Sequence, residues 1–444
     1  MFQGSKPWLV LGLGKTGRSV IAFLIKQGCQ VFAWAEAADL KVLERDFPTV
    51  RFAVGEFPSA WPQDFTCFAA AVVSPGLPYS HPLVQNALQK IDVYSDYDLF
   101  LEVCTAKVVA VTGTNAKSSV TTLLEKIARC AGVNAIAGGN LGEPALDLLE
   151  SNADCYILEC SSFQLQYTKN WRCDAAVFLN FQPDHLDQHA SIEEYLSSKQ
   201  KIFDNCEHAI VNYEQPDLYN GTCKKVSYFA KSSSGKDVCG WQHKQNDAVL
   251  YVGKQEILKL SACPAWVHIY PENIAAAVAV AASQGWLNGV SDAVAEYQPL
   301  PHRLEKVLSH NDITWYDDSK ATNVSAAVAG VNAIKTIVGG QVIWICGGLS
   351  KGVDLTPLAA ALTNVRCVIC YGQDAKLLAD ITSNICPTVV VQDLAAAVDV
   401  AEQQALADDA VILAPACSSF DQFKNFNERG DVFQKLVKAA NYAG

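Results

Sequence analysis

The sequence has too little positive charge for a surface that binds nucleic acid or an anionic membrane. It holds 34 lysine and arginine residues against 46 aspartate and glutamate residues, which gives a formal net charge of −12 at pH 7. A surface of this sign repels polyanions. Small anionic substrates stay open, because glycine-rich loops and helix N-termini bind phosphate even in acidic proteins. We therefore expect small-molecule substrates and no nucleic-acid partner.

The chain also lacks a hydrophobic run long enough to cross a membrane. Its most apolar later segment, 274–282, is about half of the roughly 18 residues that a membrane span requires. Residues 1–7 contain no apolar stretch of the kind that secretion signals have. We expect a cytoplasmic protein that is monomeric and has no membrane partner.

Cysteine is present but without the spacing of a disulfide framework. The 16 cysteines are scattered along the chain, as expected for free thiols in a reducing compartment. Cys367 and Cys370 form a CxxC pair inside the apolar run 366–371. Side chains three positions apart on a strand point to opposite faces. With no second pair to complete a zinc site, we interpret both thiols as structural.

What the chain does have is an α/β pattern that begins three times. Apolar strands and helical segments alternate from residue 8, again from 107, and again near 301, a rhythm typical of parallel sheets. A single core rarely exceeds about 250–300 residues. We predict an α/β protein of three domains, 1–95, 96–299 and 300–444, with a hinge at 299–301. The polar stretch 213–255 predicts hairpins within the second domain.

A glycine turn follows the first strand. Residues 12–17 read GLGKTG between a strand and a helix, so their backbone can approach a diphosphate at the helix N-terminus. Glu36 lies about 20 residues further on, which also suits a nicotinamide dinucleotide. Three readings stay open: UDP or a similar diphosphate, which we favour, a dinucleotide, and a turn that serves packing alone.

A second turn, 112–119, reads TGTNAKSS after a strand and before a helix. Lys117 is placed to neutralise phosphates and Ser118 to ligate Mg²⁺. The strict P-loop pattern requires glycine where this chain has Ala116. Either Ala116 takes a positive φ at a cost of roughly 1–2 kcal/mol, which we favour, or the loop has been rebuilt. An ordinary capped helix is the alternative to phosphate binding.

Polar residues end the next strands of the second domain. Glu159 closes one apolar strand, and Asp184 and His185 follow another, a set that suits a divalent cation. We interpret His189 as solvent-exposed. Lys199 lies in a helical pattern and, judged without further context, reads as a surface lysine.

Polar turns also follow the strands of the third domain. Residues 301–305 read PHRLE, 316–323 read YDDSKATN, 347–351 read GGLSK and 415–424 read PACSSFDQFK. Two acids, a lysine and hydroxyls within 316–323 are too polar for a core, although a solvated turn is the simpler interpretation of that segment alone.

Taken in order, these motifs resemble the Mur ligases, and within them the D-glutamate-adding branch. The resemblance rests on GLGKTG, SPGL, VTGTNAKSS, GGNLG, LECSSFQL, DHLD, the helix with Lys199, LPHRLE, DDSKATN, GGLSKGVD and PACSSFDQFKNFNERG, which span about residues 8–437. It implies a Rossmann-like UDP-binding domain, a central P-loop-type ATPase domain and a Rossmann-like C-terminal domain. It also implies an ATP-dependent ligase of peptidoglycan precursor synthesis.

The resemblance assigns roles that the residues alone do not. It implies UDP-substrate contacts at Gly14, Lys15, Thr16, Ser74, Gly76, Asn140 and His185. It implies ATP contacts at Gly113, Thr114, Asn115, Ala116, Lys117, Ser118, Ser119, Asn273, Arg303 and Asp318. It implies D-glutamate contacts at Lys320, Thr322, Lys351, Ser419 and Phe426. Mg²⁺ or Mn²⁺ is expected at Ser118, Glu159, His185 and a carbamylated Lys199, with Lys117, Lys199 and His185 catalytic.

Three departures from the family pattern keep rival functions open. Ala116 replaces a glycine, 267–273 keeps only the last asparagine of its usual motif, and 33–36 lacks the usual Asp-Thr-Arg. An NAD-dependent dehydrogenase would explain GLGKTG but not Lys117 and Ser118. A second rival is a nucleotide-binding module without turnover, and a third is a Mur-type or folate-type ligase for another amino acid.

Overall fold

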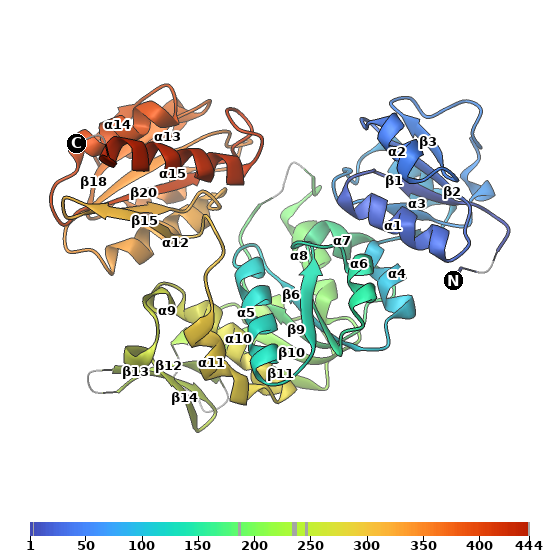
Figure 1. The fold of residues 1–444 in the computed structure, drawn as a ribbon, viewed down its shortest axis with the longest axis horizontal. Helices are drawn as coiled ribbons and strands as arrows, with labels where there is room; N and C mark the ends of the chain where they lie inside the picture. The colour runs from blue at the N-terminus through green and yellow to red at the C-terminus, as the bar shows by residue number, and fades with distance from the viewer. Residues whose placement is uncertain (3, 185–187, 233–237, 245–246, 443–444) are drawn as a thin grey trace. The chain divides into compact units, whose positions relative to one another are not determined.

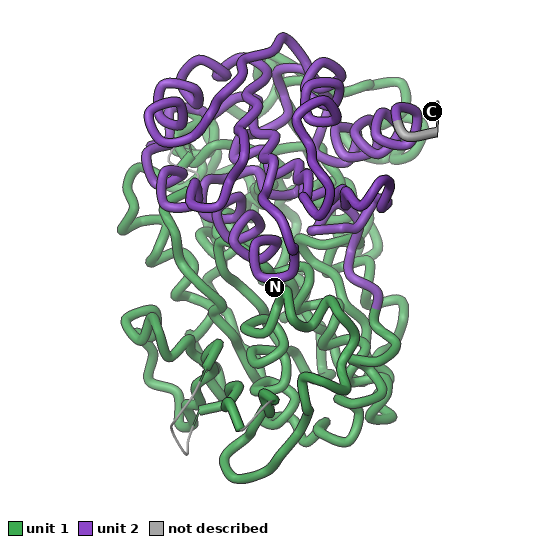
Figure 2. Tube along the Cα trace, turned by 90° about the vertical axis from the view of Figure 1, so that its left-hand side faces the viewer, with its two compact units in different colours: residues 1–297 green, residues 298–444 purple. Residues whose placement is uncertain are grey.

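The computed structural model describes residues 1–444 except 3, 185–187, 233–237, 245–246 and 443–444, and it contains three sheets (Figure 1). The chain divides into two compact units, residues 1–297 and 298–444 (Figure 2). The first unit holds two of the sheets and the second holds the third. The predicted fold class, a three-domain α/β protein with mainly parallel sheets, is confirmed.

The first sheet is parallel throughout and has the strand order β3-β2-β1-β4-β5. Its strands are β1 (Trp8–Leu11), β2 (Val31–Ala35), β3 (Arg51–Val54), β4 (Ala71–Val73) and β5 (Val93–Tyr94). The associated helices are α1 (Lys15–Lys26), α2 (Leu40–Asp46) and α3 (Pro82–Lys90). Because β1 lies between β2 and β4, the loops that follow β1 and β4 emerge side by side at the carboxyl edge, where open α/β sheets bind ligands.

The second sheet has nine strands in the order β14-β13-β12-β11-β10-β9-β6-β8-β7. They are β6 (Lys107–Thr112), β7 (Ala135–Gly139), β8 (Cys155–Glu159), β9 (Cys173–Phe178), β10 (Cys206–Asn212), β11 (Lys225–Ser232), β12 (Val238–Lys244), β13 (Asp247–Val252) and β14 (Gln255–Lys259). The hairpins predicted within 213–255 are present, since β12, β13 and β14 pair antiparallel. The prediction missed that β11 and β12 first extend the parallel sheet.

Helices of the second domain cover this sheet. They are α4 (Asp96–Val103), α5 (Lys117–Cys130), α6 (Ala145–Leu148), α7 (Ser162–Tyr167), α8 (Ile192–Gln200), α9 (Ala265–Ile269), α10 (Pro271–Gln284) and α11 (Val290–Glu296). In α5 the buried Val120, Leu123, Leu124 and Ile127 recur at helical spacing, so one face packs on the sheet. Helix α5 also contacts α10 and α11, and α10 has alanine or valine at eight of its 14 positions, most of them buried.

The third sheet fills the second unit, with strand order β15-β16-β20-β17-β18-β19. Its elements are β15 (Glu305–His310), β16 (Ile313–Asp317), α12 (Val324–Lys335), β17 (Val342–Gly347), β18 (Val365–Tyr371), α13 (Ala375–Thr382), β19 (Thr388–Val390), α14 (Leu394–Gln404), β20 (Ala410–Ala416) and α15 (Phe426–Tyr442). Only β15 pairs antiparallel. The carboxyl ends of β16, β20 and β17 are therefore neighbours at one edge.

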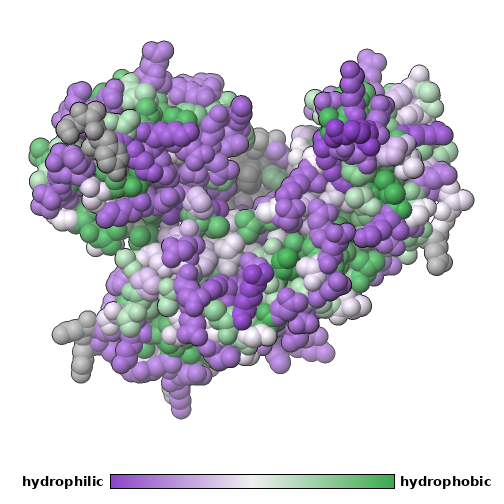
Figure 3. All heavy atoms as spheres, in the orientation of Figure 1, coloured by the Kyte–Doolittle hydropathy of each residue, from purple (hydrophilic) through white to green (hydrophobic). Residues whose placement is uncertain are grey.

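Two further findings concern membranes and thiols. No helix among the described residues is long and apolar enough to cross a membrane, and the face in Figure 3 mixes hydrophilic and hydrophobic residues. Cys367 and Cys370 are buried on β18, where Cys367 belongs to the core beneath α14 and Cys370 lies 3.8 Å from Cys346, sulfur to sulfur. The structural interpretation of this pair agrees with the opposite directions of the two side chains.

Candidate active site

In the glycine turn after β1, Gly12 and Gly17 are required for close packing, whereas Gly14 faces open space. A Cβ on Gly17 would lie 2.0 Å from the carbonyl oxygen of Gly12, so α1 could not approach the strand with any other residue there. A Cβ on Gly14 or Gly76 would meet nothing within 4 Å. The hydroxyl of Ser74, after β4, donates to the Gly12 carbonyl. The turn thus serves packing at its ends and leaves its middle open.

Lys15 and Thr16 lie in the first turn of α1, beside this open space. The ammonium of Lys15 donates to the carbonyl of Gly142 at 2.7 Å and pairs with Glu143 at 3.1 Å. Gly142 belongs to the loop after β7, which also carries Asn140. The structure therefore brings the predicted contacts after β1, β4 and β7 into one part of the first unit.

The loop between β6 and α5, residues 113–116, is held by hydrogen bonds to Asn180. Asn115 N–H donates to the side-chain oxygen of Asn180, and Thr114 N–H donates to the Asn180 carbonyl, both at 2.9 Å. Ala116 has φ = 67°, in the left-handed region. The favoured reading of Ala116 is confirmed: a residue with a Cβ holds a conformation that normally favours glycine.

Two lysines converge on one carbonyl of this loop. The side-chain nitrogens of Lys117 and Lys199 each donate to the Gly113 oxygen at 2.8 Å, and Lys117 also donates to the Thr114 carbonyl. Lys199 is 2% exposed, so its reading as a surface lysine is wrong. Its nitrogen lies 4.9 Å from the ring centroid of Tyr195, one helical turn earlier on α8. Burial, and then the nearby charge of Lys117, lower the pKa of Lys199 well below its ordinary value.

Glu159, at the end of β8, presents one engaged and one open oxygen. Its Oε1 accepts from the Asn140 side chain at 2.7 Å, while its buried Oε2 has no hydrogen-bond partner among the described residues. The carboxyl is 2% exposed. Burying a carboxylate oxygen without a hydrogen-bond donor costs free energy unless a cation binds to that oxygen. This donor set, with Ser118 at the start of α5, fits a hard divalent cation.

His185 lies outside the described residues, so its predicted roles as metal ligand, substrate contact and catalytic group stay predictions. The prediction for His189 was wrong, because this side chain is buried at 3% exposure. Its ring stacks on Phe163, with centroids 5.1 Å apart, and its Nε2 lies 3.0 Å from the Ser162 hydroxyl. A hydrogen-bonding and stacking partner on α7 makes a buried histidine favourable here.

Asn273 lies in the first turn of α10, the helix that packs on α5. It therefore shares a domain with the 113–119 loop. Arg303 and Asp318, the other predicted nucleotide contacts, belong to the second unit. Asp318 is buried and accepts from the Leu304 N–H at 3.2 Å, and burial raises its pKa to about 7.

The predicted amino-acid contacts gather at the carboxyl ends of β16, β20 and β17. The Lys320 ammonium lies 4.2 Å from the ring centroid of Phe426, and the Thr322 N–H donates to the Lys320 carbonyl. The loops after β17 and β20, which carry Lys351 and Ser419, are joined through paired backbone bonds between Leu349 and Ser418. Four of the five predicted residues thus lie on three adjacent loops of the second unit, and the fifth, Phe426, begins α15.

Comparisons with known proteins settle the family. Three family models match consecutive parts of the chain: the Mur ligase MurD-like N-terminal domain over residues 6–93, the Mur ligase middle domain over 111–281 and the Mur ligase glutamate ligase domain over 302–417. A UDP-N-acetylmuramoylalanine–D-glutamate ligase of Alcanivorax borkumensis is 38% identical over 431 residues, 96% of each chain. This chain belongs to the Mur ligase family.

Other relatives agree with this assignment. The ligase of that name from Pseudomonas putida is 35% identical and covers 97% of this Mur ligase and 96% of its own length. A solved UDP-N-acetylmuramate-alanine ligase from Thermotoga maritima is 16% identical, with a TM-score of 0.61 over 98% of this chain and all of that one. A pseudomurein peptide ligase type C from Methanothermus fervidus gives the same identity, coverage and TM-score. At this identity the two structures show the fold alone.

Sequence reasoning missed three residues that shape the site of this Mur ligase. Asn180 holds the 113–116 loop from the end of the predicted strand 175–180, and polar residues at strand ends are a usable signal. Tyr195 lies four residues before Lys199, on the same helical face, and its hydroxyl is 3.2 Å from the Thr114 hydroxyl. Arg429 belongs to the motif of residues 415–430, but the sequence gives no sign that its side chain is completely buried.

Proposed function

We propose that this Mur ligase uses ATP to join D-glutamate to UDP-N-acetylmuramoyl-L-alanine, a step of peptidoglycan precursor synthesis. The observation that carries the proposal is similarity over nearly the whole chain, at 33–38% identity, to relatives named UDP-N-acetylmuramoylalanine–D-glutamate ligase. The phosphate loop with Lys117, and Glu159 on the neighbouring strand, support the ATP-dependent step.

The chemistry begins with a carboxylate that an amine cannot attack directly. The substrate carboxylate oxygen attacks the γ-phosphorus of ATP, ADP leaves, and an acyl-phosphate forms. Lys117 neutralises the charge that spreads over the transferred phosphoryl group, and this neutralisation is the main catalytic demand of the step. The amine of D-glutamate then attacks the acyl carbon, the amide bond forms, and phosphate leaves with the former carboxylate oxygen.

We assign the remaining roles as follows. Mg²⁺ or Mn²⁺, when bound, supplies Lewis-acid charge neutralisation at the phosphates. Ser118, Glu159, His185 and Lys199 would hold the metal, with His185 and Lys199 beside the substrate carboxylate. Gly14, Lys15, Thr16, Ser74, Gly76, Asn140 and His185 would contact the UDP-substrate. Residues 113–119, Asn273, Arg303 and Asp318 would contact ATP, and Lys320, Thr322, Lys351, Ser419 and Phe426 would contact D-glutamate.

The same proposal covers organisation and setting. The domains would be 1–95 for the UDP-substrate, 96–299 for ATP and 300–444 for the amino acid and part of ATP. The enzyme would act as a cytoplasmic monomer on small molecules only, without nucleic-acid or membrane partners.

Lys199 has the character that carbamylation requires. Only a neutral amine attacks CO₂: the N–C bond forms, a proton is released, and the cation becomes an anion with two oxygen donors. The lowered pKa of Lys199, caused by its burial and by Lys117, favours this neutral form. Carbamate oxygens suit a hard divalent cation, which an ammonium group would repel.

NMR of the enzyme in ¹³C-bicarbonate tests the modification. We expect a carbamate carbon signal that Lys199→Ala removes. We also expect the variant to be nearly inactive and partly rescued by formate or acetate. Full activity of Lys199→Ala in CO₂-free buffer would show that Lys199 stays a plain lysine.

Phosphate release tests the function as a whole. The enzyme is incubated with ATP, Mg²⁺ and UDP-N-acetylmuramoyl-L-alanine, and with each of a panel of D- and L-amino acids. We expect release that depends on D-glutamate. Release with another amino acid would reassign the substrate. Protection by ATP against unfolding without any release would indicate a nucleotide-binding module, and tight NADH binding without ATP binding would indicate a dehydrogenase.

A further inference from the structure

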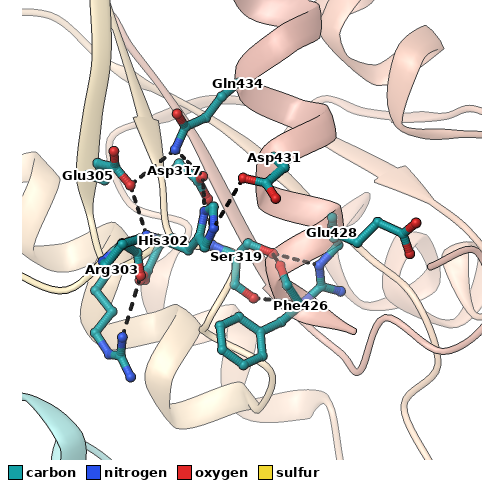
Figure 4. Close-up of polar contacts among 12 residues, drawn as sticks. His302, Arg303, Glu305, Asp317, Ser319, Phe426, Glu428, Asp431 and Gln434 are labelled. Atoms are coloured by element: carbon teal, nitrogen blue, oxygen red, sulfur yellow. Dashed lines mark hydrogen bonds and ion pairs between the residues drawn. The ribbon is translucent and has the colours of Figure 1, made fainter. Parts of the chain in front are cut away.

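The first turns of α15 bind two of the three loops that carry the predicted amino-acid contacts (Figure 4). Arg429 is fully buried, and its guanidinium donates to the Ser319 hydroxyl, the Ser319 carbonyl and the Cys417 carbonyl at 2.8–3.0 Å. The Ser319 hydroxyl in turn donates to the Phe426 carbonyl. The loops after β16 and β20 are thus fixed to one helix, and the position of Lys320 depends on that attachment.

His302 lies at the centre of this arrangement. It is 5% exposed and has φ = 59°, and its Nδ1 is 2.7 Å from Asp317 Oδ2. On the other side of the ring, Nε2 lies 3.7 Å from Asp431 of α15. The helix can come this close only because residue 430 is glycine: a Cβ there would be 2.2 Å from the His302 ring.

The backbone of His302 connects this ring to Lys320. The Lys320 N–H donates to the His302 carbonyl at 3.1 Å. Asp317, the ring's partner, accepts the Ser319 N–H at 2.9 Å through its other oxygen. The residues on both sides of the Ser319–Lys320 peptide are therefore held by the His302–Asp317 pair, and the Lys320 side chain continues over the Phe426 ring.

The charges facing His302 favour its imidazolium form. They are mostly acidic: Glu305 of β15, Asp317 and Asp318 at the end of β16, and Asp431 of α15 favour this form, whereas the cations Arg429 of α15 and Arg303, adjacent in the chain, oppose it. The hydrogen bond to Asp317 is the main cause that raises the pKa of His302 above its ordinary value, and burial opposes it. As an imidazolium, the ring donates toward Asp317 and Asp431 at once.

The cluster is a hydrogen-bonded network and not a metal site. The ligand atoms of His302, Glu305 and Asp317 do lie within 4.8 Å of one another. However, the Gln434 amide donates to Glu305 Oε2 at 3.1 Å and to Asp317 Oδ2 at 2.9 Å. With the imidazole and this amide directed at them, the oxygens already have donors.

We propose that the imidazolium of His302 is a positioning group for the amino-acid substrate, because it fixes the 317–320 turn against α15 and thereby sets Lys320. The proposal rests on the proposed function only in taking Lys320 as an amino-acid contact. His302 itself touches no substrate in this account. Its charge acts through Asp317 and through the backbone of residue 302.

The test compares wild type with His302→Gln in the full-length enzyme from pH 6 to 9, by measuring KM for D-glutamate and for ATP. Below the pKa of His302 we expect the variant to raise KM for D-glutamate about tenfold, the size of one lost charge-assisted bond. KM for ATP should stay within about twofold of wild type. The ratio of variant to wild-type KM for D-glutamate should fall toward one as pH rises. The reason is that His302 of the wild type becomes neutral and loses the same attraction to Asp317 that the variant lacks. Titration of the substrate amine affects both enzymes equally and therefore cancels in the ratio.

Asp431→Asn is the matched control, since it removes only the exposed charge facing Nε2 and should change the ratio far less. If His302→Gln does not fold, Gln434→Met tests the attachment of the same turn to α15 by removing the amide donor to Asp317 and Glu305, and a rise of about threefold in KM for D-glutamate, without one for ATP, is expected. An equal rise in both KM values, or a ratio that does not change with pH, would overturn the proposal. Failure of the proposed function would appear separately, as wild-type enzyme that does not use D-glutamate.

Discussion

At the residue scale, the centre of the site is a carbonyl shared by two lysines. Lys117 and Lys199 both donate to Gly113, at the N-terminus of α5. The helix end and the Lys117 ammonium favour an anion in the same place. Lys117 lies on α5, the helix that we expect to meet the phosphates, whereas Lys199 is buried on α8. This difference explains why we give the first an electrostatic role and the second a metal-binding role.

Replacing Lys117 with alanine should abolish most of the turnover while leaving the fold intact. Loss of a group that neutralises transition-state charge typically lowers kcat by about 10²-fold or more. Lys126→Ala is the matched control: it lies on the same helix, pairs with Glu296 at the surface, and should leave kcat unchanged. Steady-state phosphate release measures both variants. A near-normal kcat for Lys117→Ala would remove the phosphate-binding assignment of this loop.

Ala116→Gly should lower KM for ATP several-fold. A Cβ at φ = 67° costs roughly 1–2 kcal/mol, and the strain lies in the loop that is expected to hold the phosphates. Asn152→Gly, at φ = 48° away from this loop, is the control for a general gain in stability. Equal KM values for wild type and Ala116→Gly would mean that the loop tolerates the left-handed alanine without effect on ATP binding.

At the element scale, α4 connects the first sheet to the Glu159 strand. Its capping box is formed by Ser95 and Asp98, and the Tyr97 hydroxyl donates to the Glu159 carbonyl at 2.7 Å. Asp96, in the first turn, is buried and accepts from the Gln164 side chain. Burial raises the pKa of Asp96 to about 7. The helix that supports the Glu159 strand therefore contains a carboxyl group that is protonated more readily than usual.

This shift predicts that Asp96 lowers stability as pH rises. Between its unfolded pKa near 4 and its folded pKa of about 7, the folded state binds the extra proton, so unfolding becomes easier with increasing pH. Asp96→Asn should raise Tm, with an advantage that grows across this window and is constant above it. Asp292→Asn, at the exposed start of α11, is the control. Calorimetry from pH 5 to 9 that finds a constant difference would contradict the assigned pKa shift.

The sequence predicted most elements and the motif loops because strand ends and glycine turns are local signals. Glu159 and the 112–119 turn could be placed from local pattern alone, since each follows an apolar strand. The buried states of Lys199 and His189 could not, because they depend on α7, α8 and β6 packing together. The hydrogen bond from Arg429 to the Ser319 carbonyl likewise joins residues 110 positions apart, and a single sequence contains no signal for such a contact.

At the scale of the whole molecule, three sheets form two compact units, and the second has a core of its own. Trp315, Ile345, Val411 and Phe433 belong to that core, which draws on strands and helices of 298–444 only. A unit with its own hydrophobic core can fold alone. The division separates Lys117 and Glu159 from the residues assigned to the amino acid, while Arg303 and Asp318, assigned to ATP, lie in the second unit.

Residues 298–444, produced alone, should therefore fold cooperatively. Circular dichroism should show a single sharp thermal transition, and a two-dimensional NMR spectrum should be well dispersed. A Phe433→Ala variant of the same fragment is the control and should unfold at lower temperature, because truncating a buried aromatic costs about 3–5 kcal/mol. A broad transition and a collapsed spectrum for the unaltered fragment would show that it depends on the rest of the chain.

The central claim, ligation through an acyl-phosphate, is tested most directly by following the carboxylate oxygen. UDP-N-acetylmuramoyl-L-alanine labelled with ¹⁸O in its alanyl carboxylate is turned over with ATP and D-glutamate, and the released phosphate is analysed by mass spectrometry. The account predicts one ¹⁸O atom in each phosphate and D-glutamate in amide linkage to the product. Unlabelled phosphate, or label found in AMP, would contradict it.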